Sequence, residues 1–250
     1  PQFITHPFRM LLAEPSFPFR FEGILNDLFS FGERVMGDRI RNPRQDLLTI
    51  IANAKLGGKP LSQSYLDGSW LLIIFAGNDT TRNSLSGAIR LLTQFPEQRK
   101  MLLENPTLID NFSHEALRMV SPVMHMRRTA MEDTELAGQR IAKDEKVVIW
   151  YGAANRDTSV FPSPDMFDLT RENVDKHLAF GHGVHRCLGN RVAQLQLKMA
   201  YERILDRFPN IYWTGRQKIE PIILVHAISS LKVNLYGKGS KRPALISANR

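Results

Sequence analysis

The sequence predicts an α+β fold that is mainly α, with helices in the first half of the chain and short strands after them. Three patterns carry this prediction. Apolar residues dominate a proline-free stretch from Ser62 to Gln94, and residues 190–208 repeat apolar residues at helical spacing. Short apolar segments alternate with turn residues after Pro122, which is typical of small β-sheets.

The expected helices follow from the apolar spacing and from the positions of proline and glycine. The stretch at 62–95 would form one helix about 45 Å long, which is enough to span a domain. Gly57-Gly58-Lys59-Pro60 breaks the chain just before it. In chain order, helices are expected at 22–40, 43–56 and 62–95, after Pro96, between Pro106 and Ser121, and at 190–208.

Strands are expected at 124–130, 135–141, 146–150 and 222–236. Turn residues lie within and between the first three of these, at Ala137-Gly138 and at Lys143-Asp144-Glu145. Residues 152–180 mix turn residues with spaced aromatic residues, which predicts an irregular but ordered segment.

Composition narrows the possible partners. The 33 basic and 25 acidic residues give a net charge of +8, which suits an acidic protein, a phosphate backbone or an anionic lipid. The basic residues are scattered and lack interleaved aromatic residues, so an acidic protein is favoured over nucleic acid. The longest apolar run, Trp70 to Gly77, is too short to cross a membrane, and no leader sequence is visible from Pro1 onward.

Cys187 is the only cysteine, which excludes an internal disulfide framework and fits a reducing, cytoplasmic location. It stands just before the helix expected from Asn190, where helix N–H groups and the dipole stabilise a thiolate, the form that binds iron. Gly183 and Gly189 allow close backbone approach and positive φ, and Phe180 can cover the sulfur. The alternative is a small buried apolar residue, which is the commoner role of a lone intracellular cysteine.

Five residues around this cysteine form a specific motif. Phe180, Gly183, His185, Cys187 and Gly189 match the Fxx(G)x(H/R)xCxG signature, and with them the sequence resembles the cytochrome P450 superfamily. The resemblance implies that haem b is the cofactor and that Cys187 is the axial ligand of its iron. It also implies a haem-thiolate monooxygenase that inserts one atom of dioxygen into a C–H bond.

A second motif, Ala76-Gly77-Asn78-Asp79-Thr80-Thr81, lies midway along the expected 62–95 helix, although Gly, Asn, Asp and Thr are poor helix formers. Gly77 would let a flat cofactor approach, and a threonine hydroxyl that takes a backbone carbonyl would open the helix to dioxygen and water. Thr80 would hydrogen-bond the dioxygen, and Asp79 would relay protons from solvent. The segment matches the family's (A/G)Gx(D/E)T(T/S) pattern. A helix N-cap is the alternative, and the apolar run before it opposes that interpretation.

Glu115 and Arg118 have i, i+3 spacing with the acid first, although such a pair is usually a solvated surface pair. They match the family's ExxR motif, and Arg171 matches the arginine that completes its charge network. The resemblance implies a buried trio that fixes the geometry of the cysteine loop, and breaking it would cost several kcal/mol.

The resemblance also suggests which residues contact haem and substrate. Haem has two carboxylates, and Arg128 and His185 are the expected cationic partners, with an exposed strand charge as the alternative for Arg128. Val123, Met124 and His125 lie where the family lines its substrate cavity.

Electrons would come from a ferredoxin and its reductase, docking near the basic residues around Cys187. The strings at 77–83, 125–130 and 185–191 are similar to those of bacterial alkane and fatty-acid terminal hydroxylases. Branches that act on terpenes and sterol side chains share parts of them. The expected substrate is therefore a small apolar molecule, an alkane or fatty acid, with a terpene or sterol side chain as the alternative.

The resemblance extends over the C-terminal part of the family fold only. Residues 1–250 are therefore expected to form a single incomplete domain that does not close a haem pocket alone, with 62–95 as its central helix and 180–208 as cysteine loop and proximal helix. Two other hypotheses remain. One is a haem protein without oxygenation, which would not need a proton relay. The other is a basic RNA- or lipid-surface protein, which rests on net charge alone.

Overall fold

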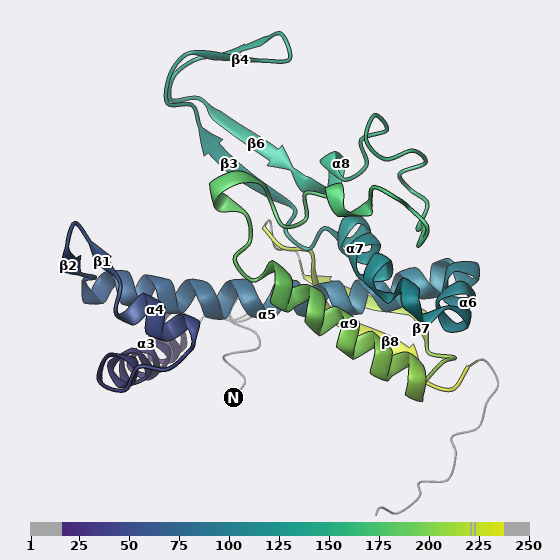
Figure 1. Ribbon diagram of the computed structural model, residues 1–250, viewed down its shortest axis with the longest axis horizontal. Coiled ribbons are helices and arrows are strands. Elements are labelled where there is room, and N and C mark those ends of the chain that lie inside the picture. Colours follow the sequence, from purple (N-terminus) through teal and green to yellow (C-terminus); the bar gives the residue numbers. More distant parts are fainter. Residues whose placement is uncertain (1–16, 221, 223, 238–250) are drawn as a thin grey trace, which may run out of the picture. The chain divides into compact units, whose positions relative to one another are not determined.

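The computed structural model describes residues 17–220, 222 and 224–237, and these form two compact parts, one ending at Asp79 and the other beginning at Thr80 (Figure 1). The predicted α+β class with mainly helical content is confirmed. Within the described ranges, no helix is long and apolar enough to cross a membrane. The expectation of a single domain over 1–250 stays a prediction.

The first part packs around Trp70. The buried indole of Trp70 donates from Nε1 to the carbonyl of Leu28 at 3.0 Å and meets Phe31 edge-on, with ring centroids 5.6 Å apart. The elements of this part are α3 (Phe17–Arg41), α4 (Leu47–Ala52), β1 (Lys55–Leu56), β2 (Lys59–Pro60) and the first half of α5 (Gln63–Gln94).

The helix expected at 43–56 is much shorter in the structure. The side chain of Asp46 accepts from the backbone N–H of Thr49 at 2.8 Å, and this cap sets the start of α4. Gly57 and Gly58 both have positive φ and turn the chain between β1 and β2. The chain break predicted at 57–60 is therefore the turn and second strand of a small hairpin.

The second part holds the other predicted helices close to their expected limits. The 62–95 prediction corresponds to α5, and the 190–208 prediction to α9 (Asn190–Arg207). The remaining elements are α6 (Pro96–Glu104), η1 (Pro106–Leu108), α7 (Ile109–Val120), α8 (Tyr151–Ala154) and two further 3-10 turns, η2 (Val174–Lys176) and η3 (Gly183–His185).

One core joins α5, α7 and α9 in this part. Helix α7 directs Phe112 and Ala116 inward, and the ring of Phe112 lies 4.7 Å from that of Tyr201 in α9. The hydroxyl of Tyr201 donates to the carbonyl of Leu85 in α5. Helix α7 ends because Ser121 takes a left-handed conformation, with φ at 42°. Figure 1 shows α9 lying beside α7.

Two antiparallel hairpins follow α7. Strands β3 (His125–Thr129) and β6 (Lys146–Trp150) pair with each other, and Figure 1 shows β4 (Thr134–Leu136) and β5 (Gln139–Ile141) at their far end. The strand expected at 135–141 is therefore two strands, because Ala137 and Gly138 both adopt positive φ and reverse the chain.

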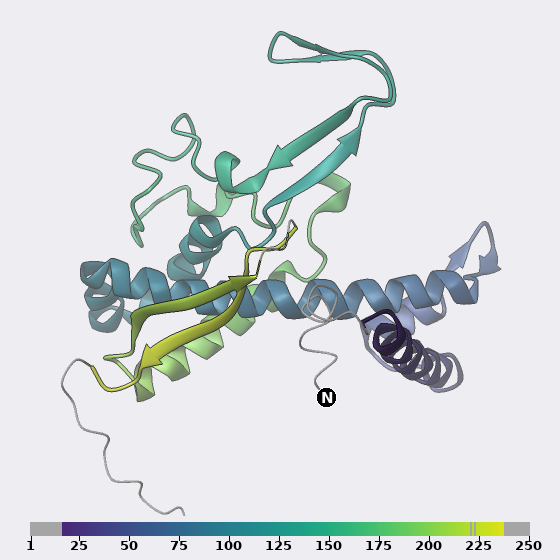
Figure 2. The ribbon, with the colours of Figure 1, turned by 180° about the vertical axis from the view of Figure 1, so that it is seen from behind.

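The last hairpin contains a strand that sequence patterns did not predict. Strand β7 (Tyr212–Glu220) pairs with β8 (Ala227–Asn234), and the latter lies within the strand expected at 222–236. The hairpin is bonded to α5, because Trp213 N–H donates to the Thr93 hydroxyl at 2.8 Å and Ile228 N–H donates to the Asn83 side chain at 2.7 Å. Figure 2, the view from behind, shows this hairpin on the near side.

Three charged side chains lie in the interior of the second part. Glu115, Arg118 and Arg171 are 0%, 0% and 7% exposed, and we call them the Glu115 network. Arg118 donates to both carboxylate oxygens of Glu115, from Nε at 2.7 Å and from Nη2 at 2.8 Å. Arg171 Nε reaches the same carboxylate at 3.3 Å. The solvated surface pair is therefore excluded as an interpretation of Glu115 and Arg118.

The network leaves little hydrogen-bonding capacity unused. Besides its two bonds to Glu115, Arg118 donates to the carbonyls of Asn155, Pro164 and Met166 at 2.7–3.1 Å, so all five guanidinium N–H groups are paired. Glu115 also accepts from the backbone N–H of Asp168 at 3.0 Å. A buried ion pair is tolerated when its remaining donors and acceptors are satisfied in this way.

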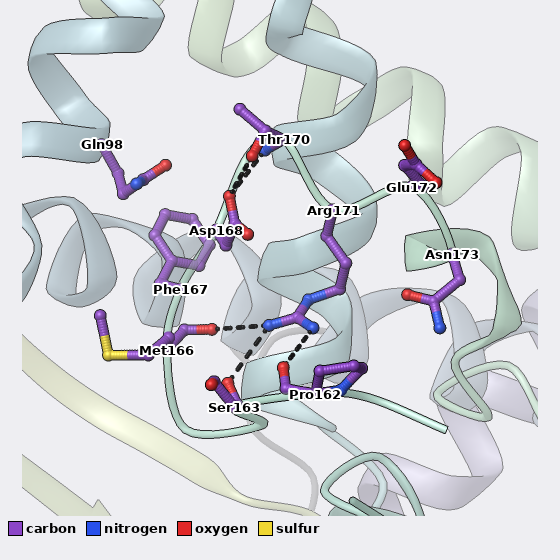
Figure 3. Close-up of a pocket in the computed structure, with 10 residues that line it drawn as sticks. All are labelled: Gln98, Pro162, Ser163, Met166, Phe167, Asp168, Thr170, Arg171, Glu172 and Asn173. Carbon is purple, nitrogen blue, oxygen red and sulfur yellow. Dashed lines mark hydrogen bonds between the residues drawn. The ribbon is translucent and has the colours of Figure 1, made fainter. Parts of the chain in front are cut away.

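Arg171 also donates hydrogen bonds to the backbone of the irregular segment 155–171. Figure 3 shows its guanidinium donating to the carbonyls of Pro162, Ser163 and Met166, at 2.8, 3.3 and 3.2 Å. These bonds explain how a segment almost without regular secondary structure is ordered, as predicted for 152–180. In a helix or strand, these backbone carbonyls would accept from backbone N–H groups, whereas here they accept from two arginines.

The network yields a first prediction. Substituting Glu115→Gln should lower the free energy of unfolding by about 3–5 kcal/mol, because two buried guanidinium groups lose their counter-charge and an amide N–H₂ is turned toward other donors. Urea unfolding measures the change. The matched control is Arg140→Met, which breaks the exposed pair with Asp133 and should cost less than about 1 kcal/mol. Equal, small effects of the two substitutions would contradict the account.

Candidate functional site

The loop 180–189 presents the single cysteine at the surface. Cys187 is exposed, so the interpretation as a buried apolar residue is wrong. Its backbone N–H donates to the carbonyl of Phe180 at 2.8 Å, which closes the loop on itself. Its carbonyl accepts from the side-chain amide of Asn190, the first residue of α9, at 2.6 Å. The backbone of Cys187 is thus held from both sides while the thiol stays accessible.

Glycine shapes this loop, though not at each of the expected positions. Gly183 has φ at +68°, as expected, and Gly181, where no positive φ was expected, has the same value. Gly189 has φ at −84°, so the expectation of positive φ there is wrong. A Cβ added to Gly189 would lie 4.0 Å from the Cys187 sulfur, which is an ordinary van der Waals contact, so neither backbone conformation nor crowding in this structure requires glycine there.

A single asparagine links the loop to the Glu115 network. Asn155 is fully buried, and its carbonyl accepts from Arg118 at 2.8 Å. Its side-chain oxygen accepts from the backbone N–H of Leu178 at 2.6 Å, and its side-chain N–H donates to Ser121 at 2.8 Å. The segment that leads into Phe180 is therefore fixed to a buried charge network. The sequence offered only turn chemistry at 155–157, which is no signal for such a role.

Two histidines outside every recognised motif lie next to this segment. His177 is 7% exposed and its ring stands 5.6 Å from that of Phe180, between centroids. Its Nε2 lies 3.2 Å from Nδ1 of His114 in α7. Burial, the largest effect, lowers the pKa of His177 to about 4. Neither residue stood out in the sequence, because their spacing of 63 residues carries no pattern.

The residues expected to meet haem carboxylates lie on separate elements. Arg128, in β3, is half-buried and donates to the carbonyl of its neighbour Arg127 at 3.1 Å. It has no carboxylate partner among the residues that the structure describes. His185 ends the turn η3 and is exposed.

The expected substrate-lining residues form the entry to β3. Val123 forms an isolated antiparallel bridge with Val225, and the carbonyl of Met124 accepts from Tyr151 N–H at 3.0 Å. The ring of His125 packs edge-on against Trp150, with centroids 4.7 Å apart. All three residues are half-buried, so they combine a fixed backbone with partly accessible side chains.

Asp79 and Thr80 lie in the middle of α5, both half-buried, which excludes the helix N-cap as an interpretation. The helical assignment of α5 is continuous through this segment, and the expected opening of its hydrogen-bond ladder stays a prediction. The hydroxyl of Ser84 donates to the Thr80 carbonyl at 2.8 Å. A Cβ at Gly77 would meet no atom within 4 Å, in line with a glycine that leaves room for a cofactor.

A pocket of about 830 Å³ lies elsewhere, around Arg171. Figure 3 shows its lining, which comes from Gln98 in α6 and from the segment 162–173. None of its lining residues belongs to the loop 180–189 or to β3. The pocket therefore belongs to the surroundings of the Glu115 network, and we do not assign it to a substrate.

Comparisons with known proteins agree with the family resemblance. The family model described as cytochrome P450 matches residues 20–229. A linalool 8-monooxygenase from Pseudomonas putida is 44% identical over 215 residues, covering 86% of this chain and 53% of the relative. Cytochrome P450-terp from a Pseudomonas species is 36% identical over 200 residues, covering 80% of this chain and 46% of the relative.

A solved structure matches the fold as well. Cytochrome P450-153 from Novosphingobium aromaticivorans superposes with a TM-score of 0.80 at 37% identity, covering 93% of this chain and 57% of that protein. The chain thus spans about half the length of the curated relatives it matches, and its fold is a partial version of theirs. With the family model matching most of its length, this chain belongs to the cytochrome P450 family.

Proposed function

We propose that this chain carries the iron-binding part of a haem-thiolate monooxygenase, with Cys187 as the ligand. The reaction is R–H + O₂ + 2 electrons + 2 H⁺ → R–OH + H₂O. The observation that carries the proposal is the accessible thiol of Cys187 in a loop anchored to the Glu115 network. Family membership implies haem as the cofactor.

The surface around the thiol fits a flat apolar group. Val184 and Leu188, on either side of Cys187, are 98% and 75% exposed, and a Cβ at Gly183 would meet no atom within 4 Å. Apolar side chains exposed to this degree gain free energy when a ligand covers them. Val184 and Leu188 would pack against a porphyrin, and the Cys187 thiolate would hold its iron.

Two side chains suit the carboxylates of such a group. The guanidinium of Arg128 has only a backbone carbonyl as its described partner, so its remaining N–H groups are available for a bidentate bond. His185 is exposed two residues before the cysteine. When bound, haem supplies the iron chemistry that activates dioxygen, with electron density from the thiolate.

The chain's own residues would supply protons for the reaction. Asp79 and Thr80 are adjacent in α5 and half-buried, which suits a carboxylate that exchanges protons with solvent and a hydroxyl that donates to dioxygen. A haem protein without oxygenation, the alternative function, has no use for this pair. The two functions therefore differ in what substitution of the pair does.

Electrons would come from a ferredoxin and its reductase. Arg186 and Arg191 flank Cys187 in the sequence and are exposed, so they suit an acidic partner. Lys198 is a weaker choice than its charge suggests, because it is paired with Asp110 at 2.9 Å.

The proposed substrate is a small apolar molecule that lies against Val123, Met124 and His125. Alkanes and fatty acids are the first class, and a terpene is the alternative supported by the relative named for linalool. A panel of an alkane, a fatty acid, linalool and a steroid tests this. We expect a hydroxylated product from at least one of them, and no product from any of the four would contradict the proposal.

The thiolate assignment is tested by Cys187→Ser in a longer, haem-loaded protein that contains this chain, because residues 1–250 are not expected to close a haem pocket alone. Serine keeps the shape of the side chain and removes the sulfur, so the reduced carbon monoxide complex should lose its thiolate-type Soret band and substrate hydroxylation should fall to background. Absorption difference spectra measure the change. An unchanged Soret position after the substitution would refute Cys187 as the ligand.

If Asp79 and Thr80 supply protons, substituting them should lower the amount of product formed per electron consumed. Asp79→Asn should lower product formation by about 100-fold, since a carboxylate that transfers protons contributes at least that much. Thr80→Ala should leave electron consumption running while less product forms, and Thr80→Ser should restore the ratio. Product and reductant are measured together in each variant. Unchanged coupling in Asp79→Asn and Thr80→Ala would favour the non-oxygenating haem protein.

A further inference from the structure

His114, His177 and the side chain of Gln194 form a continuous chain that connects three elements. Nδ1 of His177 lies 3.2 Å from the backbone nitrogen of Ala179, and its Nε2 lies 3.2 Å from Nδ1 of His114. Nε2 of His114 lies 3.2 Å from the side-chain amide of Gln194 in α9. We call these three side chains the histidine chain. It ends at the residue that precedes Phe180.

The Ala179 end of the histidine chain determines which ring nitrogen of each histidine carries the proton. The backbone N–H of Ala179 can only donate, so Nδ1 of His177 must carry no proton. The proton of His177 is then on Nε2 and is donated to Nδ1 of His114. The proton of His114 is therefore on Nε2, and the amide of Gln194 must turn its oxygen toward it. Side-chain amides can be turned in this way, whereas a backbone N–H cannot.

Both histidines must be neutral for this arrangement, and their surroundings favour that. Burial is the largest effect that lowers the pKa of His177 to about 4. His114 and the positive charges of Arg118 and Arg186 also lower this pKa. Asp175, on the same 3-10 turn as Lys176, opposes them.

The pKa of His114 is lowered as well. Burial is again the largest cause, and the carboxylates of Asp175 and Asp110 oppose it. Asp110 is shared with Lys198 of α9, whose ammonium donates to the carboxylate at 2.9 Å. A neutral His114 is therefore compatible with the acids that face it.

The histidine chain acts at the point where the cysteine loop begins. The ring of His177 packs against Phe180, and the carbonyl of Phe180 accepts from Cys187 N–H at 2.8 Å. Leu178 N–H is already held by Asn155, so two backbone amides of this segment are fixed by two independent groups. One group belongs to the Glu115 network and the other to the histidine chain.

We propose that His177 is a positioning residue for the cysteine loop, aimed by His114 and Gln194 and holding the segment before Phe180 through the N–H of Ala179. The proposal rests on the proposed function, because its consequence is the geometry of Cys187 as an iron ligand. A proton on Nδ1 of His177 would remove the acceptor for Ala179 and release this end of the loop.

Three substitutions in haem-loaded protein separate the two ends of the His177 ring. His177→Asn keeps an acceptor near the position of Nδ1 but does not titrate. His177→Gln reaches toward His114 but lacks an acceptor placed for Ala179. His177→Phe keeps a ring and loses both bonds. The matched control is His182→Asn, which changes an exposed histidine nearby.

The readout is the loss of the thiolate-type Soret band of the reduced carbon monoxide complex at pH 7. We expect His177→Phe and His177→Gln to lose it at least about threefold faster than the wild type, and His177→Asn and the control to stay within about twofold of it. Wild-type rates in both His177→Phe and His177→Gln would overturn the proposal.

A pH series gives a second readout that a merely structural role would not change. The pKa of His177 is lowered in the closed loop, so an open loop takes up a proton first, and acid favours opening between the usual histidine value and about pH 4. Wild-type opening should rise by up to about tenfold per pH unit in that window, and below it the rise should level off. His177→Asn should lack this component. The same slope in wild type and His177→Asn would overturn the proposal.

Amide exchange at Ala179 keeps this test apart from that of the proposed function. A wild-type protein without any thiolate-type band would contradict the assignment of Cys187, not that of His177. In that case faster exchange of the Ala179 amide in His177→Phe than in His177→Asn still supports the positioning role, and equal exchange refutes it.

Discussion

The second part of this structure depends on the ion pairs and hydrogen bonds that the buried carboxylate of Glu115 makes. This carboxylate lies in the interior and is surrounded by donors from two arginines and one backbone amide. Charges removed from water in this way are stable only if each is paired and the remaining N–H groups find acceptors. The acceptors are backbone carbonyls of the segment 155–166, so the charges dictate the path of a segment without regular structure.

The segment 155–166 in turn fixes the chain that leads into the cysteine loop. Asn155 receives one bond from Arg118 and accepts another from Leu178, only a few residues before the loop that closes on Cys187. The histidine chain, on this account, secures a second amide independently. An iron ligand needs this kind of support, because an exposed loop with several glycines has no rigidity of its own.

Sequence patterns predicted the parts of this fold that repeat. Helices α5 and α9 have long apolar periodicity, and their limits were found to within about two residues, as expected for such elements. Strand β7 was missed because most of its side chains are exposed, so it lacks alternation. The turn at Ala137-Gly138 was visible in the sequence, but its consequence, a hairpin in place of one strand, was not.

The residues of the site likewise divide into those that a local sequence pattern predicts and those that it does not. Residues close together in the sequence around Cys187 form a motif, whereas Asn155 and His177 act through contacts over 23 and 63 residues that no local pattern records. The positive φ expected at Gly189 is wrong, since its φ is −84° and an added Cβ would make only an ordinary contact with the sulfur. Gly183 does have the expected positive φ, so the glycine pattern predicted the backbone at one of the two positions.

The central claim is that the buried charges hold the cysteine loop, and amide exchange in Arg171→Met tests it most directly. Arg171 contacts Glu115 and the carbonyls of 162–166 but makes no hydrogen bond to the described residues of the loop. Exchange at Leu178 and Cys187 should be at least about tenfold faster than in the wild type, with the β7–β8 amides unchanged. Unchanged protection at Leu178 and Cys187 would contradict it.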